Sequence, residues 1–155
     1  MNILKSGSDG TPMHNSYCVT LLIHGHRQIL ADKPPLASSE VRLTSIGHAV
    51  AAIWQALALH FPSMHTAAFY LMPDGICGMV TIDAASGSAT AALRLLNRAI
   101  HCFKAQTTRV FNSSSTQDYR SRLWQTAFQC EAVATTDEWA ALQQQLTTQG
   151  AYRVW

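Results

Sequence analysis

The chain has 155 residues and a mass of 17.0 kDa, which fits a single domain with a sizeable hydrophobic core. Hydrophobic residues make up 48% of the sequence and charged residues 13%, which excludes an intrinsically disordered chain and favours self-association. The formal net charge of +2 does not by itself indicate a nucleic-acid-binding protein. With no apolar run of membrane-spanning length and no signal-peptide pattern, we expect a cytoplasmic protein that does not enter a membrane.

The cysteine pattern indicates neither a zinc ribbon nor a disulfide framework. The four cysteines lie far apart and include no C-x-x-C pair: Cys18, Cys77, Cys102 and Cys130. Such scattered thiols suit a reducing compartment, and we expect no cofactor.

The N-terminal half predicts an arm, a strand and a helix. Residues 1–15 are polar and contain glycine, so we expect a flexible arm, followed by one domain over 16–155. The sequence YCVTLLIHGHR is rich in β-branched and aromatic residues and predicts a strand that closes near Arg27. After the break at ADKPP, Ser38 or Ser39 can cap a helix that runs to about Phe61.

A β-hairpin is expected next. The segments 66–72 and 76–82 are apolar and separated by Pro73-Asp74-Gly75, which has the residue types that a tight turn requires.

A long helix with one basic side is predicted from about Ala89 to Phe111. Leu96, Ile100 and Phe103 recur on its apolar face. Between Asp83 and Glu131 six basic residues stand against Asp118 alone, a local balance of +5. These six residues are Arg94, Arg98, Lys104, Arg109, Arg120 and Arg122. A solvated helix face is the ordinary explanation of such residues, but the lack of acidic partners favours a surface for phosphates.

The remaining segments complete an α+β pattern. Residues 123–133 predict a fourth strand or a strand that runs into a helical turn, and Thr136 opens a final helix whose early acidic residues suit the helix dipole. The order β-α-β-β-α-β-α is that of a ferredoxin-like fold, a four-stranded antiparallel sheet with helices packed on one face. We expect the other sheet face to be free for a ligand, a partner or a second subunit.

Several colinear motifs resemble the single-tyrosine transposases of the His-hydrophobe-His superfamily, especially the REP-associated transposases and their insertion-sequence relatives. YCVTLLIHGHR is similar to the family's opening strand, and Met72-Pro73-Asp74-Gly75-Ile76-Cys77 stands where the family has Met-Pro-Asp-His-x-His. Phe103-Lys104 and the run Leu123-Trp124-Gln125-Thr126-Ala127-Phe128-Gln129 match two later motifs. The resemblance covers the chain from about Tyr17 onward.

The reactive residues that this resemblance implies are absent from the sequence. The family's two metal-binding histidines fall at Gly75 and Cys77, and its nucleophilic tyrosine falls at Gln129. Glycine offers no ligand, a single thiolate does not suit magnesium or manganese, and glutamine forms no phosphotyrosine link. We therefore expect no transposase catalysis and no metal at these positions.

Two relocated sites remain open as alternatives. His24 and His26 share one face of the first predicted strand, so a soft-metal site with Cys77 is conceivable in a ferredoxin-like sheet. Tyr119 precedes the lost nucleophile position by ten residues and fits a loop aromatic better than a nucleophile.

Two functions are compatible with these sequence features. In the first, the protein binds single-stranded or hairpin DNA without cleaving it, and the six basic residues contact phosphates. In the second, the domain is a protein-interaction or small-ligand-binding module that forms a homodimer through the free sheet face.

Overall fold

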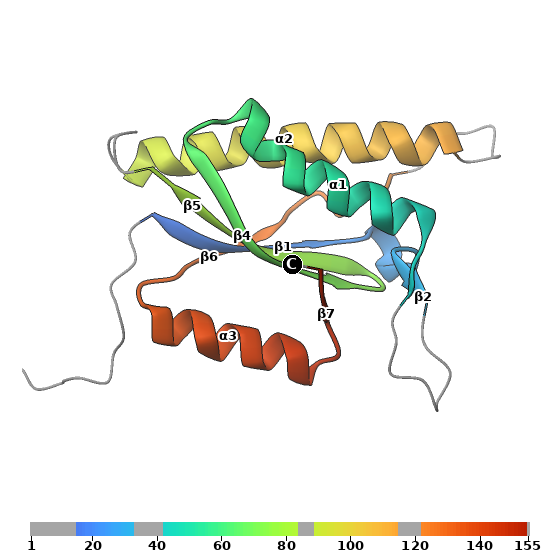
Figure 1. Cartoon of the computed structure of the whole chain (residues 1–155). Helices are drawn as coiled ribbons and strands as arrows, with labels where there is room; N and C mark the ends of the chain where they lie inside the picture. Colours follow the sequence, from blue (N-terminus) through green and yellow to red (C-terminus); the bar gives the residue numbers. More distant parts are fainter. Residues whose placement is uncertain (1–14, 33–41, 84–88, 115–121, 155) are drawn as a thin grey trace, which may run out of the picture.

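The computed structural model describes residues 15–32, 42–83, 89–114 and 122–154, and Figure 1 shows how its elements are arranged. The predicted arm at 1–15, apart from Asn15, and the predicted capping residues Ser38 and Ser39 lie outside the described residues. The elements in chain order are β1 (Ser16–Leu22), the 3-10 helix η2 (His24–His26), β2 (Ala31–Asp32), β3 (Arg42–Leu43), α1 (Ser45–His60), β4 (Met64–Met72), β5 (Gly75–Ile82), α2 (Ala89–Ser114), β6 (Gln129–Ala132), α3 (Thr136–Thr148) and β7 (Tyr152–Arg153).

An antiparallel sheet with the strand order β6-β1-β5-β4-β7 forms the centre of the molecule. Met72 pairs with Gly75, so Pro73 and Asp74 form the hairpin turn between β4 and β5. The strand β7 adds only a two-residue pairing at one edge. The α+β class and the four-stranded antiparallel sheet predicted from the sequence are confirmed.

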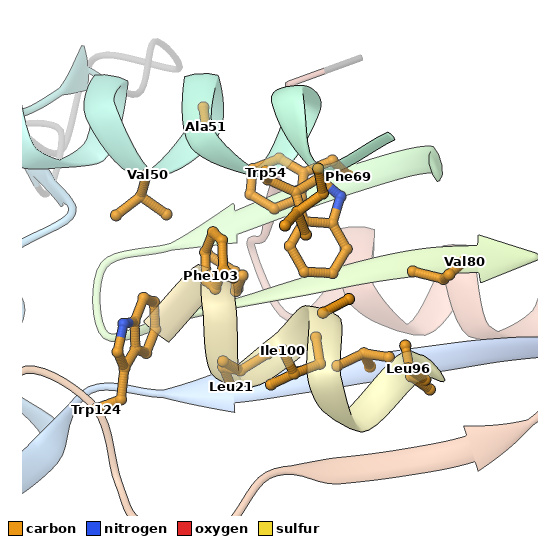
Figure 2. Close-up of a cluster of buried hydrophobic side chains, with 14 of the residues drawn as sticks. Leu21, Val50, Ala51, Trp54, Phe69, Val80, Leu96, Ile100, Phe103 and Trp124 are labelled. Atoms are coloured by element: carbon orange, nitrogen blue, oxygen red, sulfur yellow. The ribbon is translucent and has the colours of Figure 1, made fainter. Parts of the chain in front are cut away.

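The helices α1 and α2 cover one face of this sheet and enclose the main core (Figure 1). Trp54 of α1 is fully buried. Its ring centroid lies 5.4 Å from that of Phe69, in a stacked arrangement, and 5.3 Å from that of Phe103, in an edge-to-face arrangement. Figure 2 shows these three rings between α1, α2 and the sheet. Because buried aromatic side chains remove large apolar areas from water, this cluster holds both helices to the sheet.

A glycine in β5 makes room for the largest of these rings. A Cβ built at Gly78 would overlap the six-membered ring of Trp54. The close packing of α1 on the sheet therefore depends on the missing side chain at this position.

The helix α1 begins later than the sequence predicts. Thr44 is its N-cap, because the Thr44 hydroxyl accepts a hydrogen bond of 3.1 Å from the backbone N–H of Gly47. The same hydroxyl donates to the backbone oxygen of Ile29 at 2.6 Å, which ties the start of the helix to the segment after η2. This second contact lies across the fold and cannot be inferred from local capping patterns.

A buried hydrogen bond connects α2 to the segment before β6. The Trp124 indole N–H donates to the Thr107 hydroxyl at 2.7 Å, and that hydroxyl donates to the backbone oxygen of Phe103 at 2.8 Å. Thr107 is fully buried, so water cannot replace it as the acceptor.

Replacing Thr107 with valine is expected to lower the free energy of unfolding by about 1–3 kcal/mol, because the Trp124 N–H loses its partner in the core. Urea unfolding followed by circular dichroism measures this loss. Thr107→Ser is the matched control, since it keeps the hydroxyl, and we expect it to lose less stability than the valine variant. Equal losses in both variants would contradict a role for the hydrogen bond.

The third helix lies on the other face of the sheet, so the prediction that all helices share one face and leave the opposite face free is wrong (Figure 1). Trp139, Leu142 and Leu146 of α3 pack against sheet residues that include Tyr70 and Cys77. These three side chains recur on one side of the helix, and the alternation of strand residues supplies an apolar patch opposite them. The face that was expected to mediate self-association is therefore partly covered by the chain itself.

Local capping fixes the start of α3. The Thr135 hydroxyl accepts from the backbone N–H of Glu138 at 3.2 Å, and the Glu138 carboxylate accepts from the backbone N–H of Ala134 at 2.7 Å. This arrangement is a variant of the capping box, because Glu138 binds the N–H of the residue before the N-cap Thr135, and the cap lies one residue before Thr136. Of the helices in the described ranges, none combines the length and the apolar character that a membrane span requires.

Candidate functional site

The three positions at which the sequence lacks the expected reactive groups lie close together on the α3 side of the sheet. Thr20 of β1 pairs with Cys77 on one side and with Gln129 on the other, so Thr20, Cys77 and Gln129 form one cross-strand row. Gly75 belongs to the next row, where it pairs with Leu22. Residues separated by more than fifty positions in the sequence are thus neighbours in the sheet.

A pocket of about 320 Å³ opens between this row and α3. Its floor includes Cys18, Thr20, Cys77, Gln129 and Glu131 from the strands. Its helical wall is formed by four residues of α3 and its C-terminal end: Leu142, Gln145, Leu146 and Gln149. Polar and apolar groups therefore mix in the lining, and Glu131 is its one charged side chain within the described residues.

The backbone around Gly75 leaves no room for a side chain. A Cβ built at this position would lie 2.7 Å from the backbone oxygen of Leu21 and 2.8 Å from Cδ2 of Leu22. Real Cβ atoms almost never approach other atoms so closely, so a histidine here would require β1 or β5 to shift. Gly75 therefore lacks a ligand atom, and the close packing of its neighbours also excludes a larger residue at this position.

Cys77 has a partner that the sequence reasoning missed. The Sγ atoms of Cys18 and Cys77 are 3.0 Å apart, and both side chains are almost completely buried. The hydrogen bond from the Cys18 thiol lowers the pKa of Cys77, and a hydrogen bond with Thr20 acts in the same direction. The same hydrogen bond to Cys77, together with burial, raises the pKa of Cys18. Alternation along β1 places Cys18 and Thr20 on one face, but only the strand register brings Cys18 to Cys77.

The alternative metal site of His24, His26 and Cys77 does not come together. The strand β1 ends at Leu22, and both histidines lie in η2, exposed at the end of the sheet. The chain turns at Gly25, whose φ of 72° is left-handed, so the strand alternation assumed for the two histidines does not apply. Nδ1 of His26 lies 3.8 Å from the Asp74 carboxylate instead. Across the described ranges, no three histidine, cysteine or acidic side chains gather in a group that could hold a metal ion.

The six basic residues predicted to contact phosphates do not form one continuous surface among the described residues. Arg94, Arg98 and Arg109 are exposed on α2, and Arg122 is exposed on the segment that leads to β6. Arg120 and Tyr119 lie outside the described residues. Because α1 and α2 lie across the sheet from α3, the outer face of α2 points away from the pocket (Figure 1).

Lys104 has a structural role that the sequence did not reveal. Its ammonium donates to the backbone oxygens of Gln125 at 2.9 Å and Thr126 at 3.0 Å, and it lies 5.7 Å from the ring centroid of Phe128. Burial lowers the pKa of this lysine. Lys104 therefore holds the segment before β6 against α2, and its half-buried ammonium is bound by backbone oxygens. A shallow hollow of about 270 Å³ beside it is lined by residues that include His101 and Arg122.

The architecture is similar to that of two solved transposase structures. A candidate transposase from Deinococcus radiodurans R1 superposes with a TM-score of 0.53 at 14% identity, over 95% of this chain and 98% of that one. A REP-associated tyrosine transposase bound to a REP hairpin gives a TM-score of 0.54 at 12% identity, over 92% of this chain and 67% of that one. No protein-family model and no curated protein matches the sequence. At these identities the similarity establishes a transposase-like fold and nothing further.

Proposed function

We propose that this protein binds single-stranded or hairpin DNA through the outer face of α2 and has lost the chemistry that cleaves a strand. The proposal rests chiefly on one observation: Cys77 and Gln129 line one pocket of a transposase-like fold and Gly75 lies in the next row of the sheet, yet none of the three carries the reactive group that the resemblance implies. The fold alone does not decide function, so the chemistry of these side chains carries the argument.

The residues at positions 75, 77 and 129 do not fit the divalent metal that the fold family implies. Magnesium requires hard oxygen ligands in octahedral geometry, and manganese prefers carboxylate and carbonyl oxygens. Position 75 supplies no ligand atom and leaves no space for one. The Cys77 sulfur is a soft ligand and is engaged with Cys18. Gln129 cannot act as the nucleophile, because a neutral amide does not form a stable phosphoester.

The arginines of α2 support the binding half of the proposal. Arg94, Arg98 and Arg109 are exposed, and within the described residues the ion pairs involve other groups, His26 with Asp74 and His65 with Asp83. Three charges on one helix face can contact successive phosphates and release condensed counterions. A hairpin or single strand is favoured as the ligand because a structure with a similar fold is bound to a REP hairpin.

The separation of the two regions makes binding without catalysis geometrically simple. The arginines lie on the α2 side of the sheet and the pocket on the α3 side (Figure 1). Loss of reactive groups from the pocket therefore leaves the electrostatics of α2 unchanged.

A fluorescence anisotropy titration with a labelled DNA hairpin tests this function. If Arg94, Arg98, Arg109 and Arg122 each contact a phosphate, the affinity should fall about 50-fold between 50 mM and 200 mM salt, from a slope of about −0.7 per contact on single strands. Incubation with manganese or magnesium should give no covalent protein–DNA adduct on a denaturing gel. Absence of binding at both salt concentrations would refute the binding half, and an adduct would refute the loss of cleavage.

The pocket under α3 favours a second candidate, a small-ligand-binding module. Its volume of about 320 Å³ is at the lower end of the range for small-molecule sites, and its lining mixes polar and apolar groups. The hairpin titration separates the two candidates, because a pure ligand module shows no salt-dependent DNA affinity. The homodimer expected with this alternative would need a surface other than the sheet face that α3 covers.

A further inference from the structure

Two thiols form an adjacent pair on the floor of the pocket under α3. Cys18 pairs in register with Met79, and Cys77 pairs with Thr20, so the two cysteines are diagonal neighbours on the same face of β1 and β5. Their Sγ atoms are 3.0 Å apart. Both cysteines also line the pocket of about 320 Å³, which gives a small molecule a route to an otherwise buried pair.

The geometry suits a disulfide better than a shared metal. Two thiolates on one tetrahedral zinc ion are about 3.8 Å apart, given a zinc–sulfur distance of about 2.3 Å. The observed 3.0 Å is already shorter than that separation. In a disulfide the sulfur atoms are about 2.0 Å apart, so the two sulfur atoms have to approach each other by about 1 Å. No third histidine, cysteine or acidic side chain in the described residues completes a metal site around the pair.

The two thiols are not chemically equivalent. The Cys18 thiol stabilises the Cys77 thiolate by a hydrogen bond, which lowers the pKa of Cys77, and Thr20 adds a second hydrogen bond. The pKa of Cys18 is raised by the same pairing and by burial. Burial raises the pKa of Cys77, and the negative charge of Glu131 raises the pKa of both thiols, as the charge of Cys130 does for Cys18. Cys77 is therefore the attacking sulfur and Cys18 the resolving one.

We infer that Cys18 and Cys77 form a peroxide-reactive dithiol that closes to a disulfide between β1 and β5. The Cys77 thiolate attacks one oxygen of hydrogen peroxide, the O–O bond breaks, and a sulfenic acid forms as hydroxide leaves and takes up a proton to become water. The Cys18 sulfur then attacks the sulfenic sulfur, the S–O bond breaks, and the thiol proton of Cys18 leaves with the hydroxyl as a second water. Overall, two thiols and one peroxide give one disulfide and two waters. In a reducing compartment the bond is transient, because thiol reductants return both cysteines.

The remaining cysteines provide an internal control. Cys102 is half-buried on α2 and accepts a hydrogen bond of 3.0 Å from the Gln106 side chain, and Cys130 is exposed on β6. A variant with Cys102→Ser and Cys130→Ser keeps only the pair, and the complementary variant with Cys18→Ser and Cys77→Ser keeps only the other two thiols. The two variants carry the same number of substitutions.

The experiment treats each reduced variant with a small excess of hydrogen peroxide, removes the excess with catalase, blocks free thiols with N-ethylmaleimide and measures the intact mass. The pair variant is expected to lose two hydrogen atoms, to take up no maleimide, and to regain both thiols after dithiothreitol. The complementary variant should form no intramolecular disulfide. In the pair variant with the further change Cys18→Ser, Cys77 should instead gain one oxygen atom that dimedone traps.

Peptide mapping of oxidised wild-type protein provides a readout that needs no substitution. We expect a non-reduced peptide that joins the segment containing Cys18 to the segment containing Cys77. The inference is overturned if both thiols of the pair variant remain open to maleimide after peroxide, if the complementary variant closes as quickly, or if the bonds formed link separate molecules on a non-reducing gel. All of these readouts are independent of DNA binding. The disulfide can therefore fail to form while the protein binds DNA, and it can form in a protein that does not bind DNA.

Discussion

Replacing Trp54 with alanine is expected to lower the free energy of unfolding by about 3–5 kcal/mol. The side chain is fully buried and packs against both Phe69 and Phe103. Its removal leaves a cavity at the point where α1, α2 and the sheet meet (Figure 2). Because the free energy of unfolding of a small domain is only about 5–15 kcal/mol, this one substitution removes a large part of the stability of the protein. Urea unfolding followed by circular dichroism measures it without relying on tryptophan fluorescence.

The matched control lies on the same helix. Leu59 is 82% exposed, so Leu59→Ala should change the unfolding free energy by no more than about 0.5 kcal/mol. If Trp54→Ala destabilises the protein no more than Leu59→Ala does, the packing of α1 described above is incorrect. Trp54→Phe is a milder variant that keeps an aromatic ring, and we expect an intermediate loss from it if the alanine variant fails to fold.

Gly78 should be energetically coupled to Trp54. A Cβ at position 78 overlaps the indole ring, so Gly78→Ala alone should cost about 1–3 kcal/mol through overpacking. In the Trp54→Ala background the ring is gone, and the same glycine substitution should cost less. We expect a coupling free energy of at least about 0.5 kcal/mol from the double-mutant cycle.

The second large effect concerns DNA affinity. If the proposed function is correct, the triple variant Arg94→Gln, Arg98→Gln and Arg109→Gln should bind a labelled hairpin about 100-fold more weakly than the wild type at 50 mM salt. Each lost phosphate contact removes about 0.7 from the magnitude of the slope of log affinity against log salt. The triple variant should therefore show a slope shallower by about 2, which anisotropy titrations at several salt concentrations measure.

Surface arginines outside α2 separate a local effect from a change in net charge. Arg42 is exposed on β3, so Arg42→Gln removes one positive charge away from the α2 face. Arg98→Gln should weaken binding several-fold more than Arg42→Gln. Equal effects of the two substitutions would show that only net charge matters, and an unchanged affinity of the triple variant would exclude α2 as the DNA-contacting surface.

Lys104 is unsuitable for such a test, although its sequence context groups it with the arginines. Its ammonium is held by the backbone oxygens of Gln125 and Thr126. Substitution there would loosen the segment before β6, and a change in DNA affinity would then reflect altered structure. The position of Lys104 on the flank of the basic side did not show whether it binds a ligand or holds the segment before β6. Its partners, Gln125 and Thr126, are about twenty residues away in the sequence.

The candidate site was only partly predictable. The resemblance predicted that Gly75, Cys77 and Gln129 stand where the family has its metal-binding histidines and its nucleophilic tyrosine, and the sheet register brings these three residues within two adjacent rows. The closeness of Cys18 to Cys77 was not predictable, because alternation gives the face of each residue but not the register between strands. The same limit applies to His24 and His26, whose two-residue spacing was assigned to a strand that ends at Leu22.

Local chemistry in the sequence was sufficient to predict the hairpin, the three helices and the α+β class, but not the start of α1, the end of β1 or the short strands β2, β3 and β7. The Pro73-Asp74-Gly75 turn, the apolar spacing of α2 and the early acidic residues of α3 each act within a few residues, so the hairpin, the helices and the α+β class followed from them. Only the tertiary structure decided which face of the sheet α3 covers, that Lys104 binds the backbone oxygen of Gln125, and that the thiols of Cys18 and Cys77 are in contact. These outcomes depend on contacts between segments that are far apart in the chain. An amphipathic helix such as α3 can bury its apolar side against either face of a sheet.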